Sequence, residues 1–109
     1  MDIAGVKCIM EEDGLQIIIE GDIDHHTAKF IREEIDKAIY YYRPSNAVMD
    51  LSKITFMDSS GLGLILGRYT HVKEAGGVLK VLDPSACAER VLRLAGAEKI
   101  IPIIKNNKR

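Results

Sequence analysis

The sequence contains no tryptophan, only two cysteines and three prolines, and aromatic residues make up 6% of it. With so few aromatic side chains, the core has to be built from Ile, Leu, Val and Met, which hydrophobic residues at 47% of the chain allow. Cys8 and Cys87 are isolated thiols, and no secretion signal accompanies them. We therefore expect two small apolar residues in a reducing, cytoplasmic compartment and no disulfide.

A strong net charge is also lacking, because 15 basic and 16 acidic residues leave a formal charge of −1. Such a chain has no long-range field to collect nucleic acid or an anionic membrane. Its short basic end, residues 105–109, is typical of a solvated terminus. No run of 18 apolar residues is present to span a bilayer. The sequence predicts neither direct nucleic-acid binding nor membrane attachment.

What the sequence does contain is an alternation of strand and helix patterns. At 109 residues it predicts one domain, residues 1–109. Apolar runs at 6–10 and 15–20 flank Asp13-Gly14, a strong hairpin signal, and predict antiparallel neighbours. Further strands are expected at 46–51, 78–82 and 99–104, with Pro102 confining the last to an edge or a terminus. The order β-β-α-β-α-β-α-β predicts an α/β fold with a mixed, mostly parallel sheet of about five strands and helices packed on it.

Three helices are expected between these strands. The first, residues 27–42, has an inward stripe; its members are Ala28, Ile31, Ile35, Ala38, Ile39 and Tyr42. The second runs from about 60 to 75 and is stopped by Gly76-Gly77. The third is expected to start with Asp83 as N-cap and Pro84 in its first turn, and to end at Gly96. Its inward residues are expected to be Ala88, Val91, Leu92 and Ala95.

Residues 56–63, FMDSSGLG, are the clearest candidate for a functional site. They join the third strand to the second helix, at the carboxyl end of a parallel strand, where open α/β sheets carry their sites. Ser59 and Ser60 fall at the helix N-terminus, where unpaired N–H groups and the helix dipole favour negative charge. Capping by Asp58 or Ser59 explains one of these residues but not the helix face that follows.

That face is unusually bare. One stripe of the second helix is apolar and predicted to be buried; it comprises Leu62, Ile65, Leu66, Tyr69 and Val72. A separate sector holds Ser60, Gly63, Leu64 and Gly67, with Ser59 at its border. Each glycine inside a helix costs about 1 kcal/mol relative to alanine, so something is expected to approach closely here. Two alternatives remain: a neighbouring helix of the same domain, or a partner protein that uses Leu64 as an exposed contact.

A phosphate on Ser59 would add about 1.5–2 negative charges. At a helix N-terminus that charge is tolerated, so the fold is expected to survive. A partner on the same surface would meet new bulk and charge next to Asp58. Phosphorylation here is therefore predicted to act on association rather than on folding.

Other chemistry has weaker support. A metal site is one interpretation of the two carboxylates and two imidazoles in residues 22–26, which are Asp22, Asp24, His25 and His26. Adjacent histidines diverge on a helix, however, unlike the i, i+4 pair of a zinc site. Asp24 more simply caps the first helix, with Thr27 in its first turn. A small serine hydrolase using Ser59 lacks the Gly-x-Ser-x-Gly elbow and room for a substrate pocket. Gly61-Leu62-Gly63 does not extend to a dinucleotide fingerprint. We expect neither a metal nor an enzyme.

Residues 56–69, FMDSSGLGLILGRY, resemble the signature of the STAS domain of bacterial anti-sigma factor antagonists. Residues 21–28, GDIDHHTA, resemble the exit of the second strand in the sporulation branch of that family, which controls sigma-F. The likeness extends over nearly the whole chain. The short stretch after Ile104 leaves open the length of the last helix common in the family.

The resemblance implies a partner-switching cycle. The unmodified protein would bind an anti-sigma factor that is also a serine kinase, and so free the sigma factor. The kinase would use ATP and magnesium to phosphorylate Ser59, and a serine phosphatase would restore it; the chain itself would carry no cofactor. The same switch in a general-stress sigma pathway is the second alternative. Partner contacts are expected around Ser59, at Asp24, His25, Thr27, Asp58, Ser60, Gly61 and Leu64.

Overall fold

The computed structural model describes residues 5–106, which form five strands, three α-helices and one 3₁₀ turn. The order of strands and α-helices is the one expected from the sequence. In chain order the elements are β1 (Gly5–Glu11), β2 (Gly14–Ile23), α1 (Ala28–Tyr42), β3 (Asn46–Met57), α2 (Ser59–Glu74), β4 (Val78–Leu82), α3 (Ala86–Leu94), η1 (Ala97–Lys99) and β5 (Ile103–Ile104).

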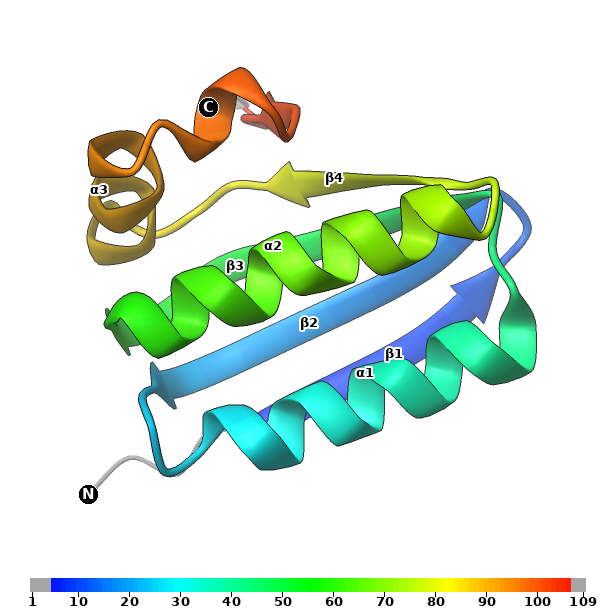
Figure 1. Ribbon diagram of the computed structural model, residues 1–109, viewed down its shortest axis with the longest axis horizontal. Coiled ribbons are helices and arrows are strands. Elements are labelled where there is room, and N and C mark those ends of the chain that lie inside the picture. The colour runs from blue at the N-terminus through cyan, green and yellow to red at the C-terminus, as the bar shows by residue number, and fades with distance from the viewer. Residues whose placement is uncertain (1–4, 107–109) are drawn as a thin grey trace.

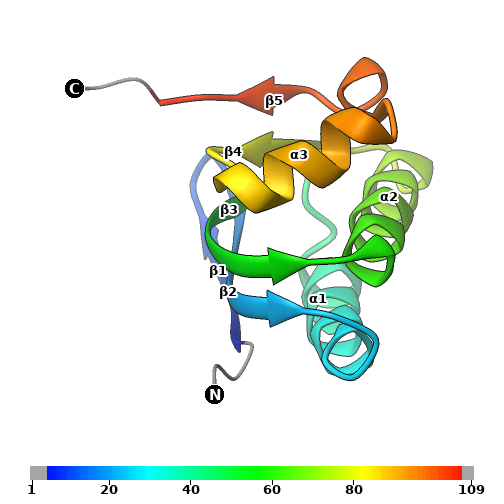
Figure 2. The same ribbon diagram turned by 90° about the vertical axis from the view of Figure 1, so that its left-hand side faces the viewer.

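The strands form one mixed sheet in the order β1-β2-β3-β4-β5. β1 is antiparallel to β2 across a two-residue hairpin, and the remaining pairs are parallel, which confirms the expected α/β sheet. α1 and α2 lie side by side on one face of this sheet (Figures 1 and 2). The core fills the space between them and the strands, and its fully buried members are mostly Ile and Leu, as the low aromatic content requires.

α1 follows its predicted stripe with one exception. Five of the six expected residues are buried, whereas Tyr42 is 41% exposed. The expectation for Tyr42 was wrong because it is the last helical residue, and the chain turns away at Arg43, whose φ is +46°. The Tyr42 ring packs at the surface, edge-on against Tyr41 with 4.8 Å between ring centroids.

β3 is twice as long as the predicted strand, with 12 residues instead of six. Its second half pairs with the end of β2, through register shifts, until Ile23 lies opposite Met57. The β propensity of Ser52 and Lys53 did not predict that the strand continues through them. The pairing with β2, and not local propensity, decides where β3 ends. This extension carries the β3–α2 junction to the same edge as the β2–α1 junction.

α3 begins later than expected. Ser85 caps it, accepting a hydrogen bond from the backbone N–H of Ala88 at 3.3 Å, so Asp83 and Pro84 lie before the helix and not inside it. Asp83 adopts a positive φ of 47°, which is incompatible with the extended geometry of an N-cap. Ala88 and Leu92 are buried and Val91 is half-buried, but Ala95 lies past the last helical residue and is exposed.

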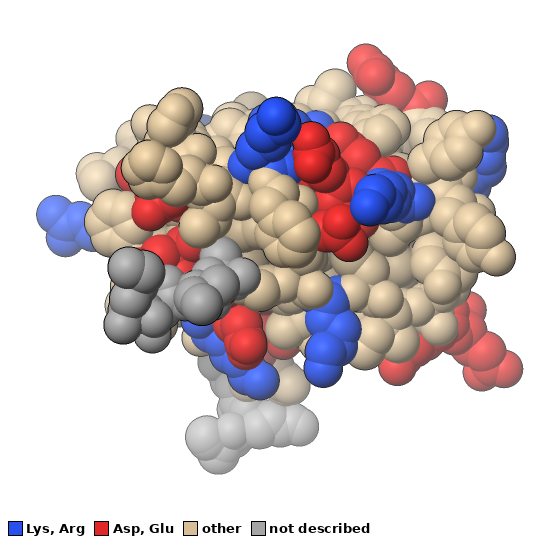
Figure 3. Space-filling model, turned by 90° about the horizontal axis from the view of Figure 1, so that it is seen from below, with Lys and Arg blue, Asp and Glu red and all other residues tan. Residues whose placement is uncertain are grey.

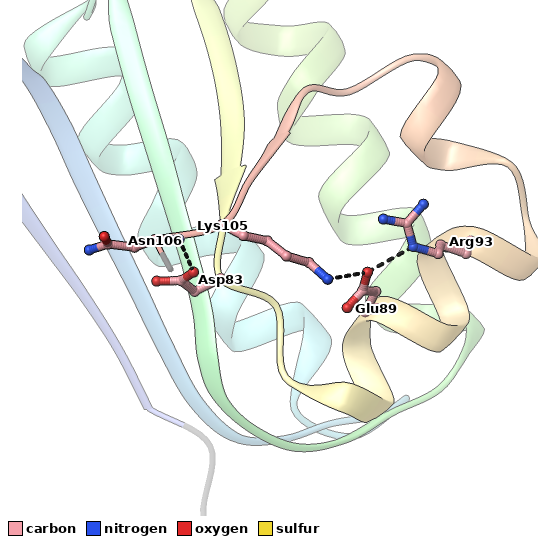
Figure 4. A network of polar contacts seen from close by, with 5 residues as sticks. All are labelled: Asp83, Glu89, Arg93, Lys105 and Asn106. Atoms are coloured by element: carbon pink, nitrogen blue, oxygen red, sulfur yellow. Dashed lines mark hydrogen bonds and ion pairs between the residues drawn. The ribbon is translucent and has the colours of Figure 1, made fainter. Parts of the chain in front are cut away.

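Residues 105 and 106, which follow the last strand, contact α3 and the residue after β4 through hydrogen bonds and an ion pair (Figure 4). Glu89 accepts from Arg93 Nε and Lys105 Nζ, each at 2.8 Å, and Asp83 accepts from the N–H of Asn106 at 2.6 Å. β5 is only two residues long, shorter than the predicted strand, because the 3₁₀ turn ends at Lys99 and the chain bends through residues 100–102 before it joins the sheet. It lies at the edge of the sheet directly after Pro102, in the position that a proline permits.

Charges of both signs stand close together on the surface around α1 (Figure 3). None of the helices formed by residues 5–106 is long and apolar enough to cross a bilayer. Cys8 on β1 and Cys87 on α3 are free thiols and half-buried.

Candidate functional site

Two strand-to-helix junctions meet at one edge of the sheet. Ile23 ends β2 and Met57 ends β3, and the two residues lie opposite each other in the parallel ladder. The backbone N–H of Asp58 extends the pairing by donating to the Ile23 carbonyl at 3.3 Å. The N-termini of α1 and α2 are therefore neighbours (Figure 2), as expected for the carboxyl edge of a parallel sheet.

Ser59 is the first residue of α2 and is exposed. Asp58 is the N-cap: its backbone is extended, and its Oδ1 accepts from the N–H of Ser60 at 2.8 Å. The sequence left open whether Asp58 or Ser59 caps the helix, and the structure assigns the cap to Asp58. The Ser59 side chain is consequently not needed to hold the helix, and a substituent on it would lie at the positive end of the helix dipole.

The helix surface beyond Ser59 is open. A Cβ added at Gly63 or at Gly67 would meet no atom within 4 Å among the described residues. The expectation of a neighbouring helix from the same domain is therefore wrong for these two positions. We call Ser59, Ser60, Gly63 and Gly67 the bare face of α2.

Leu64 does not belong to the bare face. It is only 4% exposed, so the expectation of an exposed Leu64 contact is wrong. Leu64 lies on the side of α2 that faces α1, so for this residue the alternative of a neighbouring helix from the same domain is the one the structure shows. The helical wheel did anticipate the sheet side, where Ile65 and Val72 are buried and Leu62, Leu66 and Tyr69 pack against the core.

Gly61 also faces inward. It is buried, and a Cβ there would lie 2.4 Å from Cγ of Met57 and 3.1 Å from Cγ2 of Ile23. The missing side chain lets the first turn of α2 approach the ends of both strands. Gly61 shapes the junction from inside and offers little surface to a partner.

Asp24 and Thr27 organise the β2–α1 turn. Asp24 Oδ1 accepts from the N–H groups of His26 at 2.8 Å and Thr27 at 3.0 Å, which both precede the helix. The expectation that Asp24 caps α1 with Thr27 in the first turn was wrong, because the turn at residues 24–27 delays the helix until Ala28 and leaves Thr27 as its N-cap. These backbone N–H groups, above all that of Thr27, lower the pKa of Asp24. Thr27 Oγ1 in turn donates to the Asp22 carbonyl at 2.8 Å.

His25 is exposed beside this turn, and its ring lies edge-on to that of His26 with 5.7 Å between centroids. No hydrogen bond links an imidazole to the Ser59 hydroxyl among the described residues, and the Asp58 carboxylate is engaged by the helix N-terminus. Within residues 5–106 no three His, Cys, Asp or Glu side chains converge as a metal site would require.

One further feature escaped the sequence reasoning. A groove of about 610 Å³ runs between α1 and α2, and Ser60, Gly63 and Leu64 line its α2 side together with Arg68. The Arg68 side chain is 12% exposed, and its Nε lies 3.0 Å from Oδ1 of Asp36 on α1. Only the packing of two helices distant in sequence creates this site; the sole signal was an arginine one helical turn after Leu64.

Comparison with known proteins assigns the chain to a family. The model of the STAS domain matches residues 6–108, nearly the whole chain. The chain belongs to the STAS domain family. Solved STAS structures share its fold: that of the anti-sigma factor antagonist SpoIIAA in its unphosphorylated form superposes with a TM-score of 0.79 at 27% identity, over 95% of this chain and 90% of that one.

Curated relatives of this STAS domain are regulatory proteins and not enzymes. The chain is 40% identical over 92 residues to an anti-sigma F factor antagonist of Paenibacillus polymyxa, covering 84% of this chain and 79% of the relative. It is 32% identical over 92 residues to an anti-sigma-B factor antagonist of Bacillus subtilis, covering 84% and 83%. SpoIIAA has also been solved in a phosphorylated form, which matches with a TM-score of 0.73 at 27% identity over 95% of this chain and 93% of that one.

Proposed function

We propose that this STAS domain is an anti-anti-sigma factor that is switched off by phosphorylation of Ser59. The unphosphorylated form binds an anti-sigma factor that is also a serine kinase and thereby frees sigma-F during sporulation. Phosphorylation ends that binding, and a serine phosphatase restores it. ATP and magnesium belong to the partners, and the cycle takes place in the cytoplasm.

The observation that carries this proposal is the bare face of α2. Gly63 and Gly67 lie within one turn of each other with open space above them, and exposed Ser59 begins the same helix. Two helical glycines that no neighbour among residues 5–106 requires are costly for the free protein. A partner backbone that must approach α2 closely explains why they are there.

The position of Ser59 explains how a phosphate would act. A dianionic group at the first residue of α2 lies at the positive end of the helix dipole, which stabilises it, so the fold is retained. Asp58 already places a carboxylate beside it, bound to the Ser60 N–H. A docked partner would thus face two neighbouring anions on a surface that was neutral at Ser59, and association is lost while folding is not.

Not all of the expected contact residues fit this role equally. Ser60 belongs to the bare face and also lines the adjoining groove with His25, and Asp58 borders Ser59. Asp24 and Thr27 act by holding the neighbouring turn. Buried Leu64 and Gly61 are left out of the proposed contact surface.

The test is incubation with the candidate anti-sigma kinase and ATP, followed by intact mass and peptide mapping. We expect one phosphate on the wild type, mapped to Ser59, and none on Ser59→Ala. Ser60→Ala is the matched control, since its hydroxyl is adjacent but half-buried, and it should be modified like the wild type. Binding of the purified phosphoprotein to the same kinase should be lost. Full binding after complete phosphorylation would refute the switch.

A second candidate is the same switch in a general-stress sigma pathway, which the similarity to an anti-sigma-B factor antagonist favours. Affinity for the two kinds of anti-sigma factor, measured side by side, separates the candidates. Stronger binding to the sigma-B type would move the protein to that pathway.

A further inference from the structure

The groove between α1 and α2 concentrates positive charge. Its charged lining comprises Lys29 and Arg32 from α1 and Arg68 from α2, with His25 and His26 at one end. No carboxylate is among the described residues that line it. Because the whole chain has a formal charge of −1, this is a local concentration and not a reflection of composition.

Arg68 is the least solvated of these cations. Its Nε lies 3.0 Å from Asp36 Oδ1, but that carboxylate oxygen is also 3.3 Å from His71 Nδ1. Neither Nε nor Nη1 of Arg68 makes a hydrogen bond with any residue in the range 5–106. Burial is the main cause that lowers the pKa of Arg68; Asp36 opposes it, and the nearby charge of Arg32 adds to it.

A partly desolvated guanidinium with unsatisfied donors is unfavourable, and an acceptor brought to it recovers that energy. Arginine presents a planar fork that matches a carboxylate, which the shared Asp36 only partly supplies. The groove thus has the chemistry of a carboxylate receptor, with apolar Ala28 and Leu64 contributing to its walls.

The groove is continuous with the bare face of α2, since Ser60 and Gly63 belong to both. A protein that docks over Gly63 therefore contacts the lining of the groove as well. We propose that the groove receives an acidic side chain, Asp or Glu, of the protein that docks on the bare face. This inference rests on the proposed function, and it adds the chemical group that the partner contributes.

The decisive variant is Lys29→Gln/Arg32→Gln, which removes two exposed charges of the groove and leaves Arg68 in place. Lys37→Gln is the matched control, because Lys37 is an exposed cation on the same helix that pairs with Glu34 outside the groove. The affinity of unphosphorylated protein for the anti-sigma kinase is measured over a range of salt concentrations. We expect the double variant to lose about tenfold or more at low salt, with a weaker salt dependence, and the control to change less than about twofold.

Arg68→Gln is the second variant, with circular dichroism to verify its fold, and it should weaken binding at least as much. Unchanged affinity of both groove variants, with Ser59 still phosphorylated, would overturn the groove assignment while the switch stands. A titration of the protein with inorganic phosphate alone, followed by NMR, tests whether the groove binds small anions. Shifts of the resonances of the groove residues, combined with unchanged partner affinity of the variants, would identify a small-anion site and would equally overturn the proposal. If the wild type binds no anti-sigma factor, the proposed function fails and this inference with it.

Discussion

Replacing the two glycines of the bare face by alanine should move stability and partner binding in opposite directions. A Cβ at Gly63 or Gly67 meets no atom of residues 5–106 within 4 Å, so the substitution adds no clash within this part of the free protein. The gain is the difference in helix propensity, about 1 kcal/mol per site. For a domain of this size that corresponds to a rise in Tm of about 4–8 °C for each alanine.

The same methyl groups occupy the surface on which a partner is proposed to lie. Gly63→Ala and Gly67→Ala should therefore weaken binding of the anti-sigma kinase while they raise Tm. Thermal unfolding by circular dichroism measures the first effect, and isothermal titration calorimetry with the unphosphorylated protein measures the second. Most substitutions that weaken an interface leave stability unchanged or lower it, so the opposite signs are diagnostic.

Gly61→Ala is the matched control in the same helix. Its Cβ would lie 2.4 Å from Met57 Cγ, so overpacking should lower the free energy of unfolding by about 1–3 kcal/mol. Two results would refute the reasoning. A lower Tm for Gly63→Ala and Gly67→Ala would show that the space above these glycines is filled in the free protein. A higher Tm with unchanged affinity for the anti-sigma kinase would show that no partner approaches the helix there.

Two further predictions concern the two junctions. Asp58→Ala removes the hydrogen bond to the Ser60 N–H and should cost about 1 kcal/mol of unfolding free energy, whereas Asp58→Asn keeps the acceptor and most of the stability; equal losses in urea melts would contradict a capping role. Asp24, whose pKa is lowered in the folded state, should contribute stability that is complete above the ordinary aspartate range and is lost as pH falls through its lowered pKa. Melts from neutral to acid pH should show a smaller acid loss for Asp24→Asn than for wild type, and parallel curves would exclude this contribution.

The sequence by itself determined the order of elements, the antiparallel hairpin, the buried stripe of α1 through Ile39 and the start of α2 to within one residue. These are local properties. They depend on side-chain periods, on turn residues and on capping, all of which act over a few neighbouring positions. For the same reason Ser59 stood out as the candidate switch residue without any coordinates.

Tertiary structure alone decided which faces of α2 are covered. A helical wheel places Leu64 beside Gly63 and Gly67, yet Leu64 is buried and Gly63 is exposed. The difference arises because α1 packs against the side of α2 that carries Leu64, whereas no atom among residues 5–106 lies within 4 Å of a Cβ placed at Gly63 or Gly67. The same packing creates the groove and brings Arg68 to Asp36, 32 positions away in the chain. Such contacts depend on how two helices sit on the sheet, and no local pattern encodes them.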